Sequence, residues 1–273
     1  MLTSIDLYSP EKGLLSLPLA DISNGYSVRS IEGLDPVKAE IVSSPIALID
    51  GSQYQSSRRE NRNLILTFGI ESDYVSTTVA QLRQVLYKYL MPKSSITIRF
   101  HVDFAHFADI SGRVESFETP LFSSSPEIKV SIICFKPDFV SPNTVLINGN
   151  TVADSTVMDI EYAGTVDAGI EFNLLVNRAL SEFTIYSQLP GGPYRSLDFI
   201  GLLQDLDVVK IVTTPGEKKV TLTRGGLETS VLYNVSPAST WISLSPGTNQ
   251  FRVQTSGDPI PYTVQYKESY GGL

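Results

Sequence analysis

The chain has 273 residues, a formal net charge of −8, one Cys and two His. The single Cys excludes an internal disulfide framework, and with two His it excludes a zinc site built from several Cys and His ligands. Both halves are acidic, which argues against a sequence-independent grip on nucleic-acid phosphates. With 42% hydrophobic residues, the chain has enough apolar material for packed cores, and its length fits two domains of roughly 130 residues each.

Two further features concern targeting. Residues 1–6 contain no cationic region followed by an apolar one, so we expect no signal peptide. No apolar run approaches the ~20 residues that a membrane-spanning helix needs. We therefore expect a soluble protein.

Three runs of β-forming residues dominate the first half of the chain, at 63–70, 94–102 and 128–135. The second run alternates apolar and polar residues, which is typical of a half-buried strand. The third is apolar on both faces, as expected of a central buried strand. The first half is therefore predicted to be built mainly on strands.

One segment, 76–91, has a helical period instead. The apolar stripe of this segment has the spacing of one helix face and consists of Val79, Leu82, Leu86 and Tyr89. Ser76 or Thr77 is predicted to cap the start of the helix, and Pro92 to end it. A single two-sided helix among strands should lie across a sheet, which makes the first half α+β.

Two prolines within 136–143 mark the predicted domain boundary, which separates a domain 1–141 from a domain 142–273. Beyond this boundary, many short strand-like runs at near-regular spacing indicate a β-sandwich. The predicted fold is therefore mainly β. It comprises a β-sandwich or barrel with one helix and a long hairpin, followed by a second β-sandwich.

Two hairpins are predicted in the second half. Asn148-Gly149 separates two apolar runs, and this dipeptide favours the positive φ angles of a type I′ turn. A second hairpin is predicted to join 208–213 to 219–224 through a turn at Pro215-Gly216.

The sequence contains no convincing catalytic or metal-binding constellation. His101 and His106 flank Asp103, but if the strand continues, their odd separation points the two imidazoles to opposite faces. The candidate acid–base pairs are carboxylates two residues apart, Asp159 with Glu161 and Asp205 with Asp207. Such pairs are ordinary on the solvent face of an antiparallel strand. We therefore expect no enzyme, no metal and no cofactor.

Three single features have more than one interpretation. Cys134 lies in an apolar run, which favours an inert core thiol. Trp241 is predicted to be a core aromatic, with stacking on a sugar ring as the alternative. The polar cluster Ser56–Arg62 is either a solvated loop or an electrostatic contact, because Arg pairs bidentately with carboxylates of an acidic partner.

Several short motifs occur in this chain in the same order as in a known protein family. In chain order they are 30–33, the cluster Arg58–Arg62 before the strand 63–68, the helix 79–90, 96–98, 110–116, the strand 129–134, 135–139, 245–253 and 262–273. In this order the chain resembles the distal tail protein family of long-tailed bacteriophages.

The resemblance implies a structural role in the virion. Six copies would form a homohexameric ring through their first domains, join the tail tube protein to the tail-tip hub protein, and let DNA pass through the lumen as cargo. The second domains, galectin-like in this family, would project outward and hold receptor-binding or other baseplate proteins. Assembly would take place in the host cytoplasm.

Candidate contact residues follow from these expectations. The ring-interface candidates are Arg58, Arg59, Arg62, Phe104, His106 and Phe107, and the last three lie in a predicted hairpin between 96–103 and 108–118. The candidate glycan-contact aromatics are Tyr194, Tyr233 and Trp241. Two other functions stay open. A tail-tube or other baseplate tube protein would form stacked rings, and a free-standing lectin-like protein would bind carbohydrate.

Overall fold

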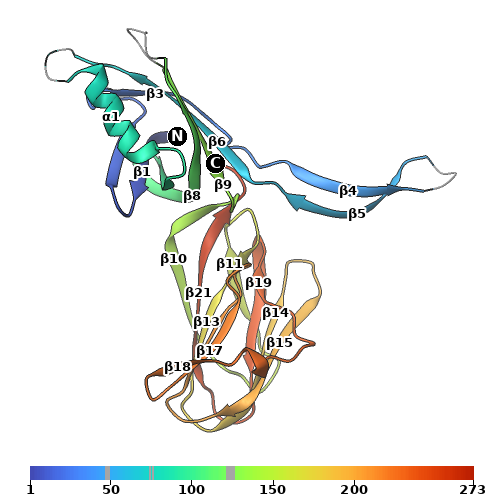
Figure 1. Cartoon of the computed structure of the whole chain (residues 1–273). Helices are drawn as coiled ribbons and strands as arrows, with labels where there is room; N and C mark the ends of the chain where they lie inside the picture. Colours follow the sequence, from blue (N-terminus) through green and yellow to red (C-terminus); the bar gives the residue numbers. More distant parts are fainter. Residues whose placement is uncertain (47–49, 74, 76, 121–126) are drawn as a thin grey trace. The chain divides into compact units, whose positions relative to one another are not determined.

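The computed structural model divides the chain into two compact units. The described residues are 1–46, 50–73, 75, 77–120 and 127–273. The first unit comprises Met1–Pro142 together with Gly271–Leu273, and the second comprises Asn143–Tyr270 (Figure 1). The C-terminal end thus differs from the predicted division, because the last three residues return to the first unit.

The first unit is built on one antiparallel sheet, a separate hairpin and a helix. Its elements are β1 (Leu2–Ser9), β2 (Gly13–Pro18), β3 (Tyr26–Glu32), β4 (Ala39–Pro45), β5 (Ser52–Arg59), β6 (Arg62–Ile70), α1 (Val79–Leu90), β7 (Ser95–Val102), β8 (Ala105–Glu118) and β9 (Glu127–Cys134). The sheet has the order β2-β1-β7-β8-β9-β6-β3, and β4 pairs with β5 in a sheet of their own. Strands β6, β7 and β9 confirm the three predicted β-runs.

Helix α1 packs its apolar stripe on the sheet. Leu82 and Leu86 are buried, as the helical period predicted. The predicted start is wrong: the N-cap is Thr78, whose side chain accepts a hydrogen bond from the backbone N–H of Gln81, while the Gln81 side chain accepts one from the backbone N–H of Thr78. This capping box needs Gln81 three residues after the cap, which selects Thr78 over Thr77. Ser76 lies outside the described residues.

The helix ends where the sequence predicted. Met91 is the C-cap with an extended backbone, and Pro92 follows it. No helix in the described part of the chain is long and apolar enough to span a membrane.

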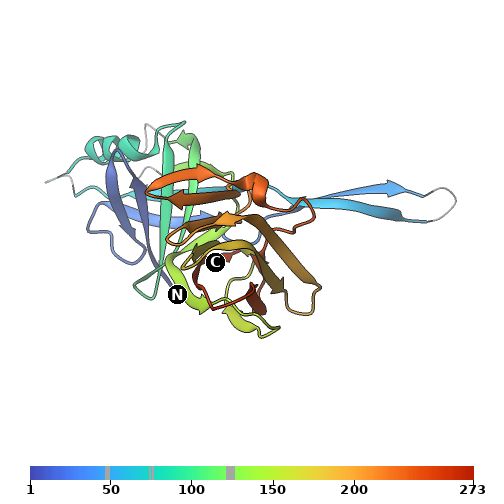
Figure 2. The same cartoon turned by 90° about the horizontal axis from the view of Figure 1, so that it is seen from below.

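The second unit is a β-sandwich, as predicted. Its elements are β10 (Phe139–Asn150), which begins in the first unit, β11 (Met158–Tyr162), β12 (Ala168–Gly169), β13 (Glu171–Leu175), β14 (Leu180–Gln188), β15 (Tyr194–Leu203), β16 (Val208–Val212), β17 (Lys219–Arg224), β18 (Leu227–Ser230), η1 (Leu232–Asn234), β19 (Ser243–Leu244), β20 (Gly247–Gln254) and β21 (Pro261–Tyr270). One sheet runs β18-β17-β16-β13-β21-β10, and the other runs β11-β20-β14-β15 (Figures 1 and 2). The core between them includes Phe172, Phe183, Phe199 and Phe251.

The predicted turn at Asn148-Gly149 is wrong, whereas the hairpin of β16 and β17 is present. Strand β10 continues through both residues, and Gly149 is not among the positive-φ glycines. A Cβ on Gly149 would lie 2.4 Å from Cζ of Tyr262. The glycine is therefore required by the close approach of the Tyr262 ring and not by a turn.

Replacing this glycine gives the first testable prediction. Gly149→Ala should lower the free energy of unfolding of the second unit by about 1–3 kcal/mol, because the added methyl group overlaps a buried ring. Trp241, the single Trp of the chain, reports on this unit in urea unfolding followed by fluorescence. Asn148→Ala, at an exposed neighbour, is the control and should stay within about 0.5 kcal/mol of the wild type. Equal stability of the two variants would contradict the prediction.

Candidate functional site

The hairpin of β4 and β5, called the arm below, extends away from the sheet of the first unit (Figures 1 and 2). Every residue of β5 is exposed, and so is every residue of β4 except Ser44. The exposed side chains include Ile41, Val42 and Tyr54. An isolated two-stranded hairpin is marginally stable in water, and each of its outer edges offers unpaired backbone groups. The arm is therefore a surface that gains stability when another chain covers it.

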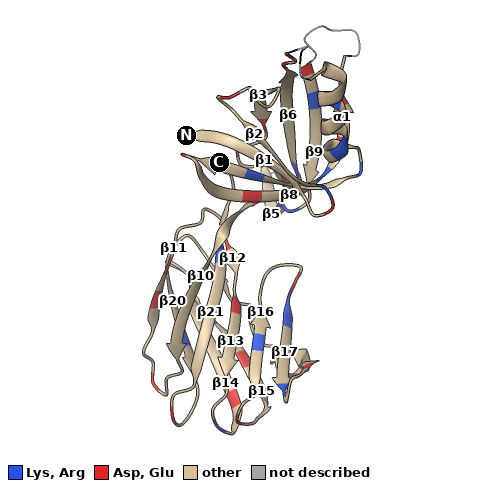
Figure 3. Cartoon of the chain, turned by 90° about the vertical axis from the view of Figure 1, so that its left-hand side faces the viewer, with Lys and Arg blue, Asp and Glu red and all other residues tan. Residues whose placement is uncertain are grey.

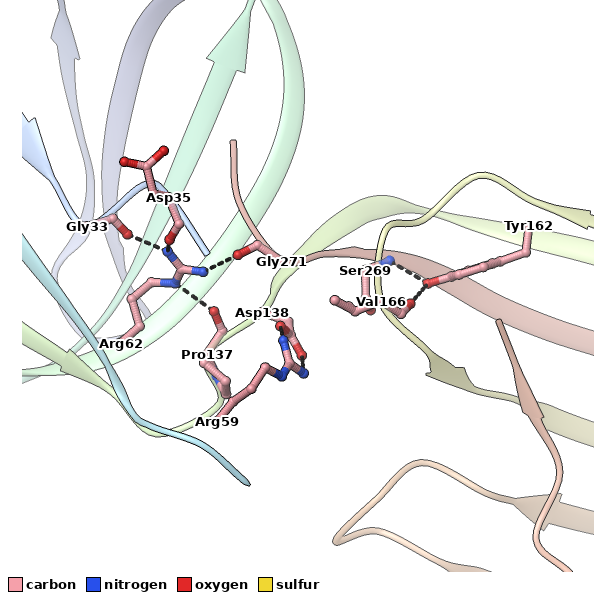
Figure 4. Close-up of polar contacts among 10 residues, drawn as sticks. All are labelled: Gly33, Asp35, Arg59, Arg62, Pro137, Asp138, Tyr162, Val166, Ser269 and Gly271. Carbon is pink, nitrogen blue, oxygen red and sulfur yellow. Dashed lines mark hydrogen bonds and ion pairs between the residues drawn. The ribbon is translucent and has the colours of Figure 1, made fainter. Parts of the chain in front are cut away.

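Two of the predicted interface arginines fix the arm. The Arg58 Nε lies 2.7 Å from Oε2 of Glu40, across the two strands of the hairpin. At the base of the arm, Arg59 forms a bidentate pair with Asp138 (Figure 4). Both side chains thus serve the arm of their own copy. Their role between copies stays a prediction.

Arg62 is not a surface residue, so its prediction as a ring contact is wrong. It is 1% exposed, and its guanidinium carbon lies 4.3 Å from the centre of the Phe139 ring. Its guanidinium donates hydrogen bonds to four backbone carbonyls, those of Gly33, Asp35, Pro137 and Gly271 (Figure 4). Burial lowers the pKa of Arg62 from its usual range. Such a side chain holds its own unit together.

The four carbonyls give Arg62 a specific place in the chain. Pro137 comes just before β10, along which the chain passes into the second unit, and Gly271 is the first residue after the chain returns. Arg62 therefore ties the outgoing and the returning segment to one point of the first unit. Within the second unit, the Tyr162 hydroxyl accepts from the Ser269 N–H and donates to the Val166 carbonyl, both at 2.9 Å (Figure 4).

The predicted ring hairpin is the tight turn between β7 and β8. Asp103 and Phe104 both have left-handed backbones, with φ of 50° and 66°. The N-terminal amine lies 2.6 Å from Oδ1 of Asp103, and the Phe104 N–H donates to the Thr3 hydroxyl at 3.1 Å. Phe104 is 90% exposed. A bulky residue with positive φ is rare, so this turn holds an apolar ring in solvent at a conformational cost. Its role as a contact stays a prediction.

The two histidines lie on the same face, so the prediction that they point apart is wrong. His101 and His106 are cross-strand partners whose rings stack with centroids 5.3 Å apart. The turn reverses the chain between them, and a single continuous strand was the wrong premise. The His101 ring contacts Asp6 at 2.8 Å and the His106 ring contacts Asp109 at 2.6 Å. Asp103 is engaged by the N-terminus instead.

The two remaining ring-interface candidates lie close to this turn. His106 and Phe107 lie just after the turn, near the start of β8, and Phe107 is 37% exposed. Their role between copies stays a prediction.

Cys134 is buried, and burial raises the pKa of its thiol to about 11. This environment fits the predicted inert thiol.

The three candidate glycan-contact aromatics do not form one platform. Tyr194 is the first residue of β15, whereas Tyr233 lies in η1, next to Asn234, which packs against Gly201 near the opposite end of β15. Trp241 is partly buried against the sandwich core, and the Lys218 ammonium lies 5.2 Å from the centre of its ring. A shared stacking surface for one sugar is therefore not built from these three residues.

Of the two carboxylate pairs, Asp159 and Glu161 share the exposed face of β11 as predicted, whereas the pair Asp205 and Asp207 differs from its expected arrangement. Asp205 lies in a turn and is exposed, whereas Asp207 is buried and bonded to Arg224 at 2.6 and 2.8 Å. This pairing lowers the pKa of Asp207. The two side chains therefore do not share an extended face. Figure 3 shows acidic and basic residues interspersed along the strands of both units.

The sequence interpretation missed the arm. The signal was Asp50-Gly51, a dipeptide typical of hairpin turns, which follows an apolar run and precedes the run that forms β5. Gly51 has the left-handed backbone that a glycine allows, with φ of 101°.

The sequence and the fold of this chain were matched to known proteins, by a family model and by solved structures. Residues 163–270 match the family model of the siphovirus-type tail component, C-terminal domain. The crystal structure of the Dit protein of phage SPP1, described as a paradigm of the hub adsorption apparatus in phages that infect Gram-positive bacteria, has a TM-score of 0.69. Its identity is 13%, covering 97% of this chain and 98% of that one.

Two structures of the phage P2 baseplate in its activated conformation are also similar. The one with Ca has a TM-score of 0.48 and 8% identity, covering 100% of both chains. The one with Sr has a TM-score of 0.47 and 7% identity, covering 97% of this chain and 98% of that one. No curated protein matches the sequence.

Residues 163–270 of the second unit match a phage tail component domain, and the chain has the fold of the SPP1 Dit protein over nearly its whole length. The chain is therefore similar to distal tail proteins in sequence over this domain and in fold over both units. The resemblance drawn from the order of the sequence motifs is confirmed.

Proposed function

We propose that copies of this chain form a closed ring in which the arm of each copy packs on the neighbouring copy. The observation that carries the proposal is the exposed arm, because a two-stranded hairpin with apolar side chains in solvent is stabilised by a covering surface. In a closed ring, the same contact with a neighbouring copy covers every arm, so that no arm stays exposed.

The chain is a structural protein of the distal tail or baseplate, as its similarity to distal tail proteins suggests. Its ring has six copies, continues the tail tube and docks on the tail-tip hub. DNA passes through its lumen as cargo, and assembly in the host cytoplasm precedes incorporation into the virion. The second unit carries receptor-binding or other baseplate proteins. We infer no catalytic role, since Asp207 is committed to Arg224 and the remaining carboxylate pair lies on an ordinary exposed strand.

Mass photometry and negative-stain imaging of the purified full chain test this proposal. The expected result is single rings with the mass of six copies. Stacked rings would favour the tail-tube alternative. A monomer at every concentration would contradict ring formation.

A further inference from the structure

Large apolar side chains gather on one flank of the second unit, far outside the arm in sequence. They are between 47% and 84% exposed and are called the apolar flank: Ile200, Leu202, Leu206, Leu227, Leu232 and Tyr233. Single exposed apolar residues are normal, but a contiguous group of this size on a protein surface marks an interaction site.

An ion pair brings three of these residues together. Arg224 lies opposite Leu227 in the β17–β18 ladder and donates to the Leu202 carbonyl at 3.1 Å. The same guanidinium binds Asp207, the residue that follows Leu206. Leu202, Leu206 and Leu227 therefore surround one neutralised pair.

The 3₁₀ turn η1 carries two of the other three residues, Leu232 and Tyr233, and Ile200 lies on β15 two residues before Leu202. The Asn234 side chain packs against Gly201, where a Cβ would lie 2.3 Å from its Nδ2. This contact and the antiparallel bridge between Phe199 and Val235 place η1 next to the edge of β15, the strand that carries Ile200 and Leu202. Exposed apolar residues that are distant in sequence thus lie on neighbouring segments at one edge of the sandwich.

The flank lies next to an open sheet edge. Strand β18 is the last strand of its sheet, is paired with β17, and exposes all four of its residues. The outer edge of β15, in contrast, is covered, since the N–H groups of Ser236 and Thr240 donate to the carbonyls of Asp198 and Ser196. Among the described strands, none pairs with the outer edge of β18. An extended chain can therefore add to the sheet at this strand.

The surrounding charge indicates what kind of chain fits. Asp205 is exposed next to Leu206, and Glu228 is exposed on β18, where it points to the opposite face of the strand from Leu227. Neither carboxylate makes an ion pair with a described residue. The Arg224 charge is already balanced by Asp207. A strand that pairs with β18 would therefore meet the apolar Leu227 on one face and the carboxylate of Glu228 on the other, which complements alternating apolar and basic side chains.

We propose that β18 and the apolar flank bind an extended segment of another protein, with alternating apolar and basic side chains. A stable dimer of globular copies needs roughly 20–30 residues on each side, far more than this flank offers. An added strand, in contrast, binds through backbone hydrogen bonds and places alternate side chains on neighbouring surface. This inference concerns the second unit and is independent of ring formation.

A labelled eight-residue peptide that alternates Val or Leu with Lys is the probe, with fluorescence anisotropy on the full chain as the measurement. The wild type should bind it. A second peptide with the same side chains, in which every other backbone nitrogen is methylated, cannot complete the strand pairing and should bind at least about tenfold more weakly. Equal binding of both peptides would overturn strand addition.

The double variant Leu202→Ser/Leu227→Ser tests the flank. It retains every charge, and since both leucines are exposed, it should unfold as the wild type does. Its affinity for the peptide should fall at least about tenfold. The matched control is Leu146→Ser/Leu175→Ser, which replaces two exposed leucines elsewhere in the second unit and should bind normally.

Three results would overturn the proposal. One is no binding of the peptide to the wild type, and another is wild-type affinity in the double variant of the flank. The third is a change in the number of copies per assembly, measured by mass photometry, when Leu202 and Leu227 are replaced, because the occupant would then be a second copy of this chain.

Discussion

A chain whose arm has lost its apolar side chains should remain monomeric at concentrations where the wild type forms rings. The variant is Ile41→Ser/Val42→Ser/Tyr54→Ser, three exposed positions on β4 and β5. Burying one large apolar side chain contributes about 1.5–3 kcal/mol, so the loss of three per contact should raise the dissociation constant at least about a hundredfold. Mass photometry over a dilution series measures this shift.

Two controls distinguish loss of the contact between copies from loss of folding. The triple variant Leu146→Ser/Leu175→Ser/Tyr194→Ser removes two aliphatic residues and one tyrosine from exposed positions of the second unit and should assemble normally. Circular dichroism of both variants should match the wild type, since none of these side chains lies in a core. Rings of unchanged stability in the arm variant would show that the arm does not join copies.

Arg62→Met should destabilise the first unit strongly. The variant leaves four buried or partly buried carbonyls without their donor and removes a guanidinium stacked on Phe139. Losses of this kind cost about 3–5 kcal/mol. Hydrogen exchange of β6 and β9 measures the effect, and exchange should also increase at Gly271, because the returning segment is no longer held.

Comparing Arg62→Met with Arg58→Met separates the effect of burial from the effect of losing an arginine side chain. Arg58 pairs with Glu40 on the surface of the arm, so its replacement should change stability by less than about 1 kcal/mol. The unfolding transition of Trp241 fluorescence should stay near its wild-type position in both variants, since Trp241 lies in the second unit. Equal hydrogen exchange of β6 in Arg58→Met and Arg62→Met would contradict the role assigned to Arg62.

Local patterns predicted the elements that depend on neighbours in sequence. The helical stripe around Leu82 and Leu86, and the alternation in β7, reflect burial of one face against a core, which sequence periodicity records directly. The turn predicted at Asn148-Gly149 was wrong because a glycine can be required either by a turn or by the close approach of another residue. The turn signal is local, whereas the need for space beneath the Tyr262 ring comes from a residue more than a hundred positions away.

The candidate site depends on contacts that sequence spacing does not record. Arg62 stands among surface-like arginines, yet its donors meet carbonyls up to 209 positions away. The two histidines became neighbours because Asp103 and Phe104 form a turn without a glycine. The arm was missed since its strands carry few apolar residues in a regular period, as a hairpin without a core of its own would.

Ring formation through the arm requires that the arm is uncovered in a single copy and covered in the assembly. Hydrogen exchange of the described arm residues, 39–45 and 52–59, measured on the assembled fraction and on the diluted monomer, tests this most directly. We expect fast exchange in the monomer and strong protection in the assembly. Equal exchange in both fractions would contradict it.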